Sequence, residues 1–142
     1  EKKMIEDLFR EINTNTGKGA YGLQEVIEFL KNNVVKTLLI TDNTNLHRVE
    51  AKCKRCNNIQ EDIVERPLVI PKKTEYRNSP CPECKAMDTE VNEQDIVDYL
   101  QIIAAKTGSQ LEVISGSAEH GNMLSSLGKI GAILRYNPGH TK

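Results

Sequence analysis

Two pairs of cysteines constrain this chain more than any other feature of its sequence. Cys53 and Cys56 enclose two residues, as do Cys81 and Cys84, and 24 residues separate the two pairs. Two such turns can hold four thiolates at the corners of a tetrahedron, which is the geometry that zinc prefers. Because four cysteine ligands leave no coordination position for water, the spacing predicts one structural zinc ion per chain rather than a hydrolytic one.

Two other interpretations of the cysteines stay open. Two structural disulfides would require an oxidising compartment, and a redox-active dithiol would require one activated pair beside a βαβ unit. The residue directly after the first pair, Asn57, suits the left-handed backbone that such a turn often needs where it reverses.

Length and charge narrow the class of protein. The chain has 142 residues, enough for one domain with an insertion and too few for a multidomain enzyme. Its 19 basic and 20 acidic residues nearly cancel, so charge alone predicts no binding to nucleic acid or to a membrane. No apolar run approaches the roughly 18 residues that span a bilayer, and residues 1–10 do not form a signal peptide. We therefore expect a cytoplasmic protein. Because the sequence opens inside a predicted helix, we also expect a fragment of a longer polypeptide.

Apolar spacing predicts alternating helices and strands. Such alternation favours an α/β sandwich. The segment 48–90 differs, because it holds all four cysteines, four of the five prolines and little helical periodicity, and it is expected to be a β-rich insertion. Helices are predicted over 4–12, 23–32, 92–108 and 117–127, with Asn92 capping the third, and strands over 37–41, 111–115 and 130–136.

These predictions give a discontinuous domain organisation. The sandwich core is expected over 1–47 and 91–137, the minidomain over 48–90 and a tail over 138–142.

No catalytic centre is predicted. Residues 17–22 match the GxGxxG phosphate-binding pattern, but they follow a predicted helix instead of a strand and are interpreted as an interhelical turn. The three histidines, His47, His120 and His140, have no serine, cysteine or carboxylate at a spacing that indicates a triad or a metal-binding helix. We therefore do not expect an enzyme.

The C-terminal third of the chain resembles a known family. Residues 111–115, Glu119, Gly121 and the segment 128–136, which ends Gly-Ala-Ile-Leu-Arg-Tyr, closely resemble the end of archaeal and eukaryotic class-1 peptide chain release factors. Five upstream segments resemble the start of the same domain: 8–12, 16–17, 21–22, 25–26 and 35–41. The resemblance therefore covers nearly the whole chain. Pelota ribosome-rescue proteins have a similar domain but usually lack the cysteine pairs, which favours the archaeal release-factor branch.

The resemblance implies a fold and a function. It implies a three-layer α/β/α sandwich like that of kink-turn-binding ribosomal proteins, with an inserted zinc minidomain. The family's stop-codon-reading motif Asn-Ile-Lys-Ser and its hydrolytic motif Gly-Gly-Gln are absent from this sequence. What the resemblance assigns to this domain is docking of a translational GTPase of the elongation-factor type and of the ribosome-recycling ATPase, with the ribosome contacted through the full-length factor.

The resemblance also implies partner-binding residues. Phe9 and Ile12 match positions that meet the GTPase, with the helix that carries Met123 nearby. Packing in the core is the alternative for all three, and the place of Ile12 near the centre of the apolar stripe favours packing there. Lys129 stands where the family often has a second glycine, which leaves the tightness of that turn open. A Pelota-type rescue domain is a related alternative. The alternatives from other classes are a kink-turn-type RNA-binding domain, which should show a basic patch, and a redox enzyme. A monomer is expected, because no heptad pattern or long apolar edge is evident.

Overall fold

The fold contains two compact units. A computed structural model describes residues 2–117 and 119–139. Unit 1 combines Glu1–Thr44 with Leu100–Lys142, and unit 2 spans Asn45–Tyr99. Among the described residues, no helix has both the length and the apolar character needed to cross a membrane.

Unit 1 is built on a mixed four-stranded sheet. Strand β2 pairs in parallel with β6 and antiparallel with β7, and β7 pairs antiparallel with β1. All residues of β2 except Lys36 are buried, which confirms the prediction of a strand covered on both faces. The strand order is β1-β7-β2-β6, with bounds Gly19–Tyr21 for β1, Val35–Thr41 for β2, Gln110–Ile114 for β6 and Ile130–Leu134 for β7.

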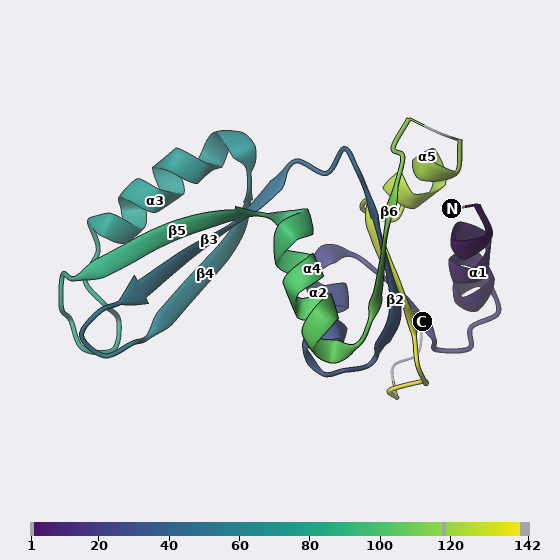
Figure 1. The fold of residues 1–142 in the computed structure, drawn as a ribbon, viewed down its shortest axis with the longest axis horizontal. Coiled ribbons are helices and arrows are strands. Elements are labelled where there is room, and N and C mark those ends of the chain that lie inside the picture. Colours follow the sequence, from purple (N-terminus) through teal and green to yellow (C-terminus); the bar gives the residue numbers. More distant parts are fainter. Residues whose placement is uncertain (1, 118, 140–142) are drawn as a thin grey trace. The chain divides into compact units, whose positions relative to one another are not determined.

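Helices cover both faces of this sheet. Figure 1 shows α1 (Lys2–Asn13) and α5 (Glu119–Ser125) on one face, and α2 (Leu23–Lys31) with α4 (Ile96–Thr107) on the other. On the first face a fully buried cluster joins helices to strands and consists of Ile5, Leu8, Leu39, Ile114 and Leu124. Unit 1 is therefore the predicted three-layer α/β/α sandwich.

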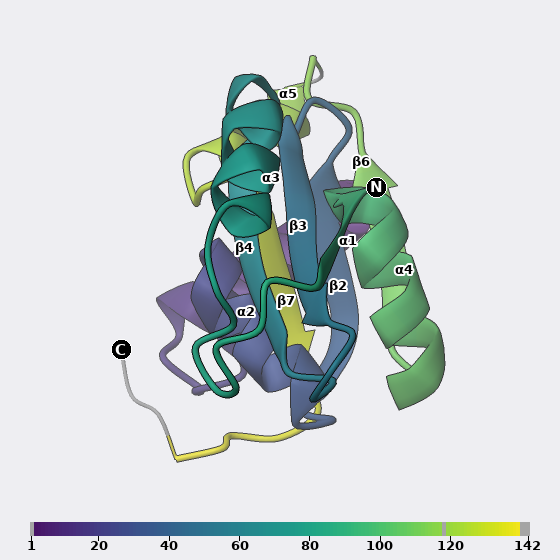
Figure 2. The ribbon, with the colours of Figure 1, turned by 90° about the vertical axis from the view of Figure 1, so that its left-hand side faces the viewer.

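Unit 2 is a three-stranded antiparallel sheet with a helix against it. The strand order is β4-β3-β5, with β3 at Leu46–Cys53, β4 at Ile59–Glu65 and β5 at Thr89–Asp95. A short 3-10 turn, Arg66–Leu68, leads into α3 (Val69–Arg77), which lies along the sheet in Figure 2. The core of this unit is small and consists of Val49, Ala51, Val69 and Tyr76.

The structure corrects several predictions of local structure. Asn92 does not cap a helix but lies in β5, and the cap of α4 is Asp95, whose carboxylate accepts a hydrogen bond from the Val97 N–H at 2.9 Å. Helix α3 was not predicted inside the insertion, and β1 was not predicted between α1 and α2. Unit 2 is wider than the expected segment 48–90, because β3 begins before this segment and β5 ends after it.

Candidate metal centre and partner-binding helices

The two cysteine pairs lie in turns of nearly identical geometry. In each turn, the N–H of the residue after the second cysteine donates to the carbonyl of the first cysteine: Asn57 to Cys53 at 2.8 Å and Lys85 to Cys81 at 2.9 Å. Both donors have left-handed backbones, with φ of 64° at Asn57 and 66° at Lys85. The prediction for Asn57 is confirmed, and Lys85 is its counterpart in the second turn.

Strand pairing brings the two turns together. Cys53 ends β3 and pairs with Thr89, the first residue of β5, so the first turn lies beside the segment that contains the second. The N–H of Lys54 donates to the carbonyl of Asp88 at 2.8 Å, which ties the turns to each other through the backbone. The sheet register thus sets the distance between the two cysteine pairs.

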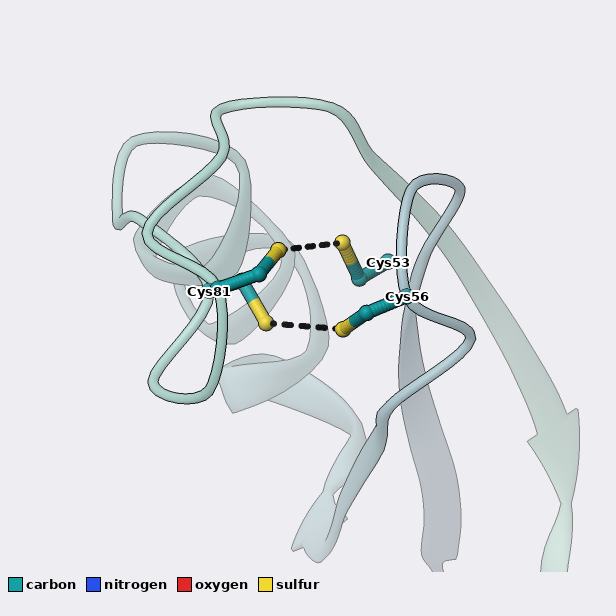
Figure 3. Close-up of side chains that lie close together, drawn as sticks. Cys53, Cys56 and Cys81 are labelled. Atoms are coloured by element: carbon teal, nitrogen blue, oxygen red, sulfur yellow. Dashed lines mark hydrogen bonds between the residues drawn. The ribbon is translucent and has the colours of Figure 1, made fainter.

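The four thiols form one cluster. Their sulfur atoms all lie within 4.8 Å of one another, with Cys53 Sγ 3.5 Å from Cys84 Sγ and Cys56 Sγ 3.6 Å from Cys81 Sγ. Figure 3 shows Cys53 and Cys56 on one turn pointing toward Cys81 on the other. A tetrahedral site with metal–sulfur bonds of about 2.3 Å places its sulfurs about 3.8 Å apart, so the cluster could bind a metal ion of zinc's size. The nearest sulfur atoms lie 3.5 Å apart, well beyond the roughly 2.05 Å of a disulfide bond.

Backbone hydrogen bonds favour ionisation of two of these thiols. The pKa of Cys53 is lowered chiefly by a hydrogen bond from the Cys56 backbone, and the pKa of Cys81 is lowered to about 6 chiefly by one from the Cys84 backbone. The Asn58 backbone also favours the Cys56 thiolate, but burial and the neighbouring thiols outweigh it and raise the pKa of Cys56. Two thiolates therefore form readily, and full ionisation of the cluster requires a compensating cation.

Basic residues in the turns suit the charge of such a centre. Four thiolates around a dication carry a net charge of about −2. Lys54 and Arg55 lie in the first turn and Lys85 follows Cys84 in the second, so basic residues outnumber the acidic Glu83 within the two turns, and Arg55 also pairs with Asp88 at 3.7 Å. The spacing of the cysteines gave no signal for this arrangement or for the left-handed backbone at Lys85.

The three predicted partner-binding residues lie on adjacent helices of unit 1. Phe9 and Ile12 belong to α1 and Met123 to α5, and both helices cover the same face of the sheet. Phe9 and Ile12 are partly buried against the core cluster, whereas the Met123 side chain is 40% exposed. Core packing thus accounts for part of the Phe9 and Ile12 surfaces and not for Met123.

The GxGxxG match is not a phosphate-binding loop. Gly17 and Gly19 come before or within β1 instead of joining a strand to a helix, so the segment is not a simple interhelical turn either. A Cβ on Gly17 would lie 2.4 Å from the Asn137 side chain, which shows that this side chain fills the space beside the loop. The mechanism that makes such a motif bind phosphate is therefore missing.

The histidines do not assemble a site among the described residues. His47 lies on β3, with Nδ1 3.7 Å from a Glu93 carboxylate oxygen. The side chain of His120 and all of His140 lie outside the part of the chain that the structure describes, as does the end of the predicted tail, 140–142.

Comparisons with known proteins agree on one family. The family model described as eRF1 domain 3 matches residues 1–138. Peptide chain release factor subunit 1 of Methanocaldococcus jannaschii is 30% identical over 96% of this chain, and that of Thermococcus onnurineus is 33% identical over the same share. The chain spans about a third of the length of these relatives, 33% and 32% respectively.

Solved structures share the fold. The C-terminal domain of a peptide chain release factor from Methanosarcina mazei has a TM-score of 0.81 and 29% identity, covering 98% of this chain and 83% of that one. Dom34 of S. cerevisiae, described as interacting with Hbs1, has a TM-score of 0.55 and 19% identity over 96% of this chain and 27% of its own. A model of ribosome-bound archaeal Pelota and ABCE1 has a TM-score of 0.50 and 22% identity over 94% of this chain and 25% of that one.

The last two structures support the fold alone, whereas the family match extends over almost the entire sequence. The resemblance to archaeal release factors predicted from the sequence is confirmed, and the chain belongs to the eRF1 domain 3 family of translation-termination proteins.

Proposed function

We propose that this domain is a non-enzymatic docking module that binds a translational GTPase through the surface formed by α1 and α5. The observation that carries the proposal is that α1 and α5 lie side by side on one face of the sheet (Figure 1), with Met123 of α5 40% exposed and Phe9 and Ile12 of α1 only partly buried. Protein-binding surfaces commonly combine an aromatic anchor with methionine or aliphatic side chains above a rigid core.

The core beneath this surface fixes both helices. Ile5 and Leu8 of α1 and Leu124 of α5 are fully buried in one cluster with strand residues. A partner would therefore meet two helices that are already in place, which reduces the ordering cost of binding.

The proposal extends to the ribosome-recycling ATPase. Dom34 is described as interacting with Hbs1, and an archaeal Pelota is described in a ribosome-bound complex with ABCE1, so proteins containing this fold take part in such assemblies. A domain of this family acting with the translation machinery would work in the cytoplasm, with the ribosome contacted through the complete factor.

Isothermal titration against the archaeal tRNA-delivering elongation factor, loaded with a non-hydrolysable GTP analogue, tests the GTPase surface. Phe9→Ala and Met123→Ala should each weaken binding about tenfold, because each truncates an anchor worth over about 1 kcal/mol. Ile102→Ala is the matched control, since Ile102 is 48% exposed on α4, on the opposite face of the sheet.

Urea unfolding of each variant separates binding from stability. Phe9→Ala can loosen the core cluster, whereas Met123→Ala removes a more exposed side chain and should leave the unfolding midpoint nearly unchanged. Unchanged affinity in Met123→Ala, or an equal loss in Ile102→Ala, would refute docking at α1 and α5.

We further propose that the four-cysteine cluster holds one structural zinc ion. Its support is the convergence of four sulfurs from two matching turns, which provides a complete ligand set and leaves no position for substrate. A redox dithiol would need one pair set apart from the other, whereas all four thiols here meet in one cluster. Bound zinc would cross-link the end of β3 to the segment before β5 and supply stability that the small core of unit 2 lacks.

Elemental analysis of freshly purified protein should give about one zinc per chain. Removing the metal with a chelator should unfold unit 2 and leave unit 1 folded, because unit 1 has a separate, larger core. Amide hydrogen exchange before and after chelation resolves the two units, and unchanged protection in β3 and β5 would refute a structural metal.

A further inference from the structure

A groove rich in positive charge lies beside α1 in unit 1. It has a volume of about 460 Å³ and runs between α1 and the end of the sheet at which β2 and β6 begin and β7 ends. Five residues with cationic side chains and two with carboxylates line it, on a chain whose net charge is −1. The cations are Lys3, Arg10, Lys18, Lys36 and Arg135.

Most of these cations are not neutralised inside the protein. No carboxylate among the described residues pairs with Lys3, Lys18 or Lys36, whereas Arg10 pairs with Asp7 at 2.8 Å. Within the described part of the chain, the Arg135 side chain donates to two backbone carbonyls, those of Asn33 at 3.2 Å and Thr107 at 2.7 Å. These bonds hold the guanidinium at the C-terminal ends of α4 and α2, whose carbonyls offset part of its charge.

The groove lies on a different side of α1 from the proposed GTPase surface. Lys3, Asp7 and Arg10 recur at helical spacing and share one flank of the helix. At about 100° per residue, Phe9 and Ile12 lie well away from that flank. A ligand in the groove would therefore leave the surface formed by α1 and α5 accessible, and the present inference does not depend on GTPase docking.

The lining indicates the chemistry of a ligand. Met4 and Ile133, both partly buried, give the groove an apolar component beside the lysines. None of the described residues that line it is aromatic, so they provide no stacking platform of the kind on which single-stranded nucleic acids usually bind. Asp7 and Glu11 would repel a continuous phosphate backbone, whereas a peptide can place separate carboxylates on the lysines and apolar side chains between them.

We propose that this groove binds an acidic peptide segment with interspersed apolar side chains, supplied by a partner protein. Its carboxylates would pair with Lys3, Lys18 and Lys36, and its apolar side chains would contact the partly buried Met4 and Ile133. Because the cations are exposed, the interaction gains mainly in association rate and specificity and weakens as salt rises.

Fluorescence anisotropy with a labelled peptide of Glu-Glu-Leu repeats tests this directly. The double variant Lys18→Glu/Lys36→Glu should bind this probe at least about tenfold more weakly than the unmodified chain at low salt. Lys106→Glu is the charge control, because Lys106 is exposed on α4 and does not line the groove, and it should bind normally.

Two further probes separate the possible outcomes. A Glu-Glu-Ser peptide should bind several-fold more weakly than the leucine peptide if the apolar lining contributes, and equal binding of the two overturns that part of the inference. A labelled single-stranded uridine RNA tests the nucleic-acid alternative. If RNA binds through Lys18 and Lys36 and the acidic peptide does not, or if neither probe binds, the proposal is wrong.

Discussion

Lys129 holds a backbone conformation that usually belongs to glycine. Its φ is 72°, directly after Gly128 at 90°, in the turn between α5 and β7. The N–H of Lys129 donates to the Leu124 carbonyl at 3.1 Å, and its own carbonyl accepts from Thr41 N–H at 3.0 Å. The turn therefore keeps its tight shape although a side chain is present.

We expect Lys129→Gly to stabilise unit 1 by about 0.5–1 kcal/mol, because relief of the left-handed strain exceeds the extra entropy of an unfolded glycine. Urea unfolding measures the change. Lys129→Ala is the control, since it removes the charge but keeps the Cβ, and equal stability of the glycine and alanine variants would contradict the explanation.

A partly buried hydrogen bond in unit 2 gives a pH-dependent prediction. The Tyr76 hydroxyl donates to a carboxylate oxygen of Asp62 at 2.7 Å, and burial followed by this hydrogen bond raises the pKa of Tyr76. Because the folded pKa lies above the unfolded value of about 10, the bond stabilises the fold below about pH 10 and is lost as pH rises further.

Spectrophotometric titration of tyrosinate should therefore show one of the four tyrosines ionising later than an unperturbed tyrosine. Tyr76→Phe should abolish this late phase and destabilise unit 2 by about 1–2 kcal/mol below pH 10. A late phase that persists in Tyr76→Phe would assign it to another tyrosine.

At the scale of elements, two glycines set how closely helices pack on the rest of unit 1. A Cβ on Gly121 of α5 would lie 1.9 Å from the Ser115 carbonyl oxygen, which is backbone and cannot easily move. A Cβ on Gly131 of β7 would lie 2.5 Å from Leu8 Cδ2, the far end of a flexible side chain on α1. The first contact is therefore much harder to relieve.

We expect Gly121→Ala to destabilise unit 1 by about 3 kcal/mol and Gly131→Ala by about 1 kcal/mol. Thermal or urea unfolding shows which of the two variants is less stable. Asn122→Ala, at an exposed position beside Gly121, is the control. If Gly131→Ala proved the more damaging, Leu8 rather than the backbone at Ser115 would be the rigid contact.

The elements that the sequence predicted are those with a continuous apolar pattern. Ile5, Leu8 and Leu39 belong to such patterns, and all three are fully buried. Helix α3 has only Val69 and Tyr76 buried, seven residues apart, so it shows no periodic stripe. Asn92 precedes an apolar periodic run and resembles a cap, but strand pairing with Glu50 of β3 keeps it in β5.

Of the candidate sites, the sequence could predict only those whose residues lie close together along the chain. The cysteine cluster follows from two short turns, each defined within a few residues. The cationic groove gathers side chains from α1, three strands and a loop, so only the register of the sheet brings Lys18, Lys36 and Arg135 together. No local pattern could have indicated it.

For the whole molecule, each unit has a separate core and a separate proposed role. Unit 1 offers α1 and α5 to a GTPase, and unit 2 carries the cysteine cluster. A partner that docks on unit 1 should therefore bind without requiring the metal.

Amide hydrogen exchange of this chain, with and without the GTP-bound elongation factor, tests the central claim most directly. Docking should slow exchange in α1 and α5 and leave α2 and α4, on the opposite face of the sheet, unchanged. Protection confined to α2 and α4, or no protection in α1 and α5 at saturating GTPase, would contradict it.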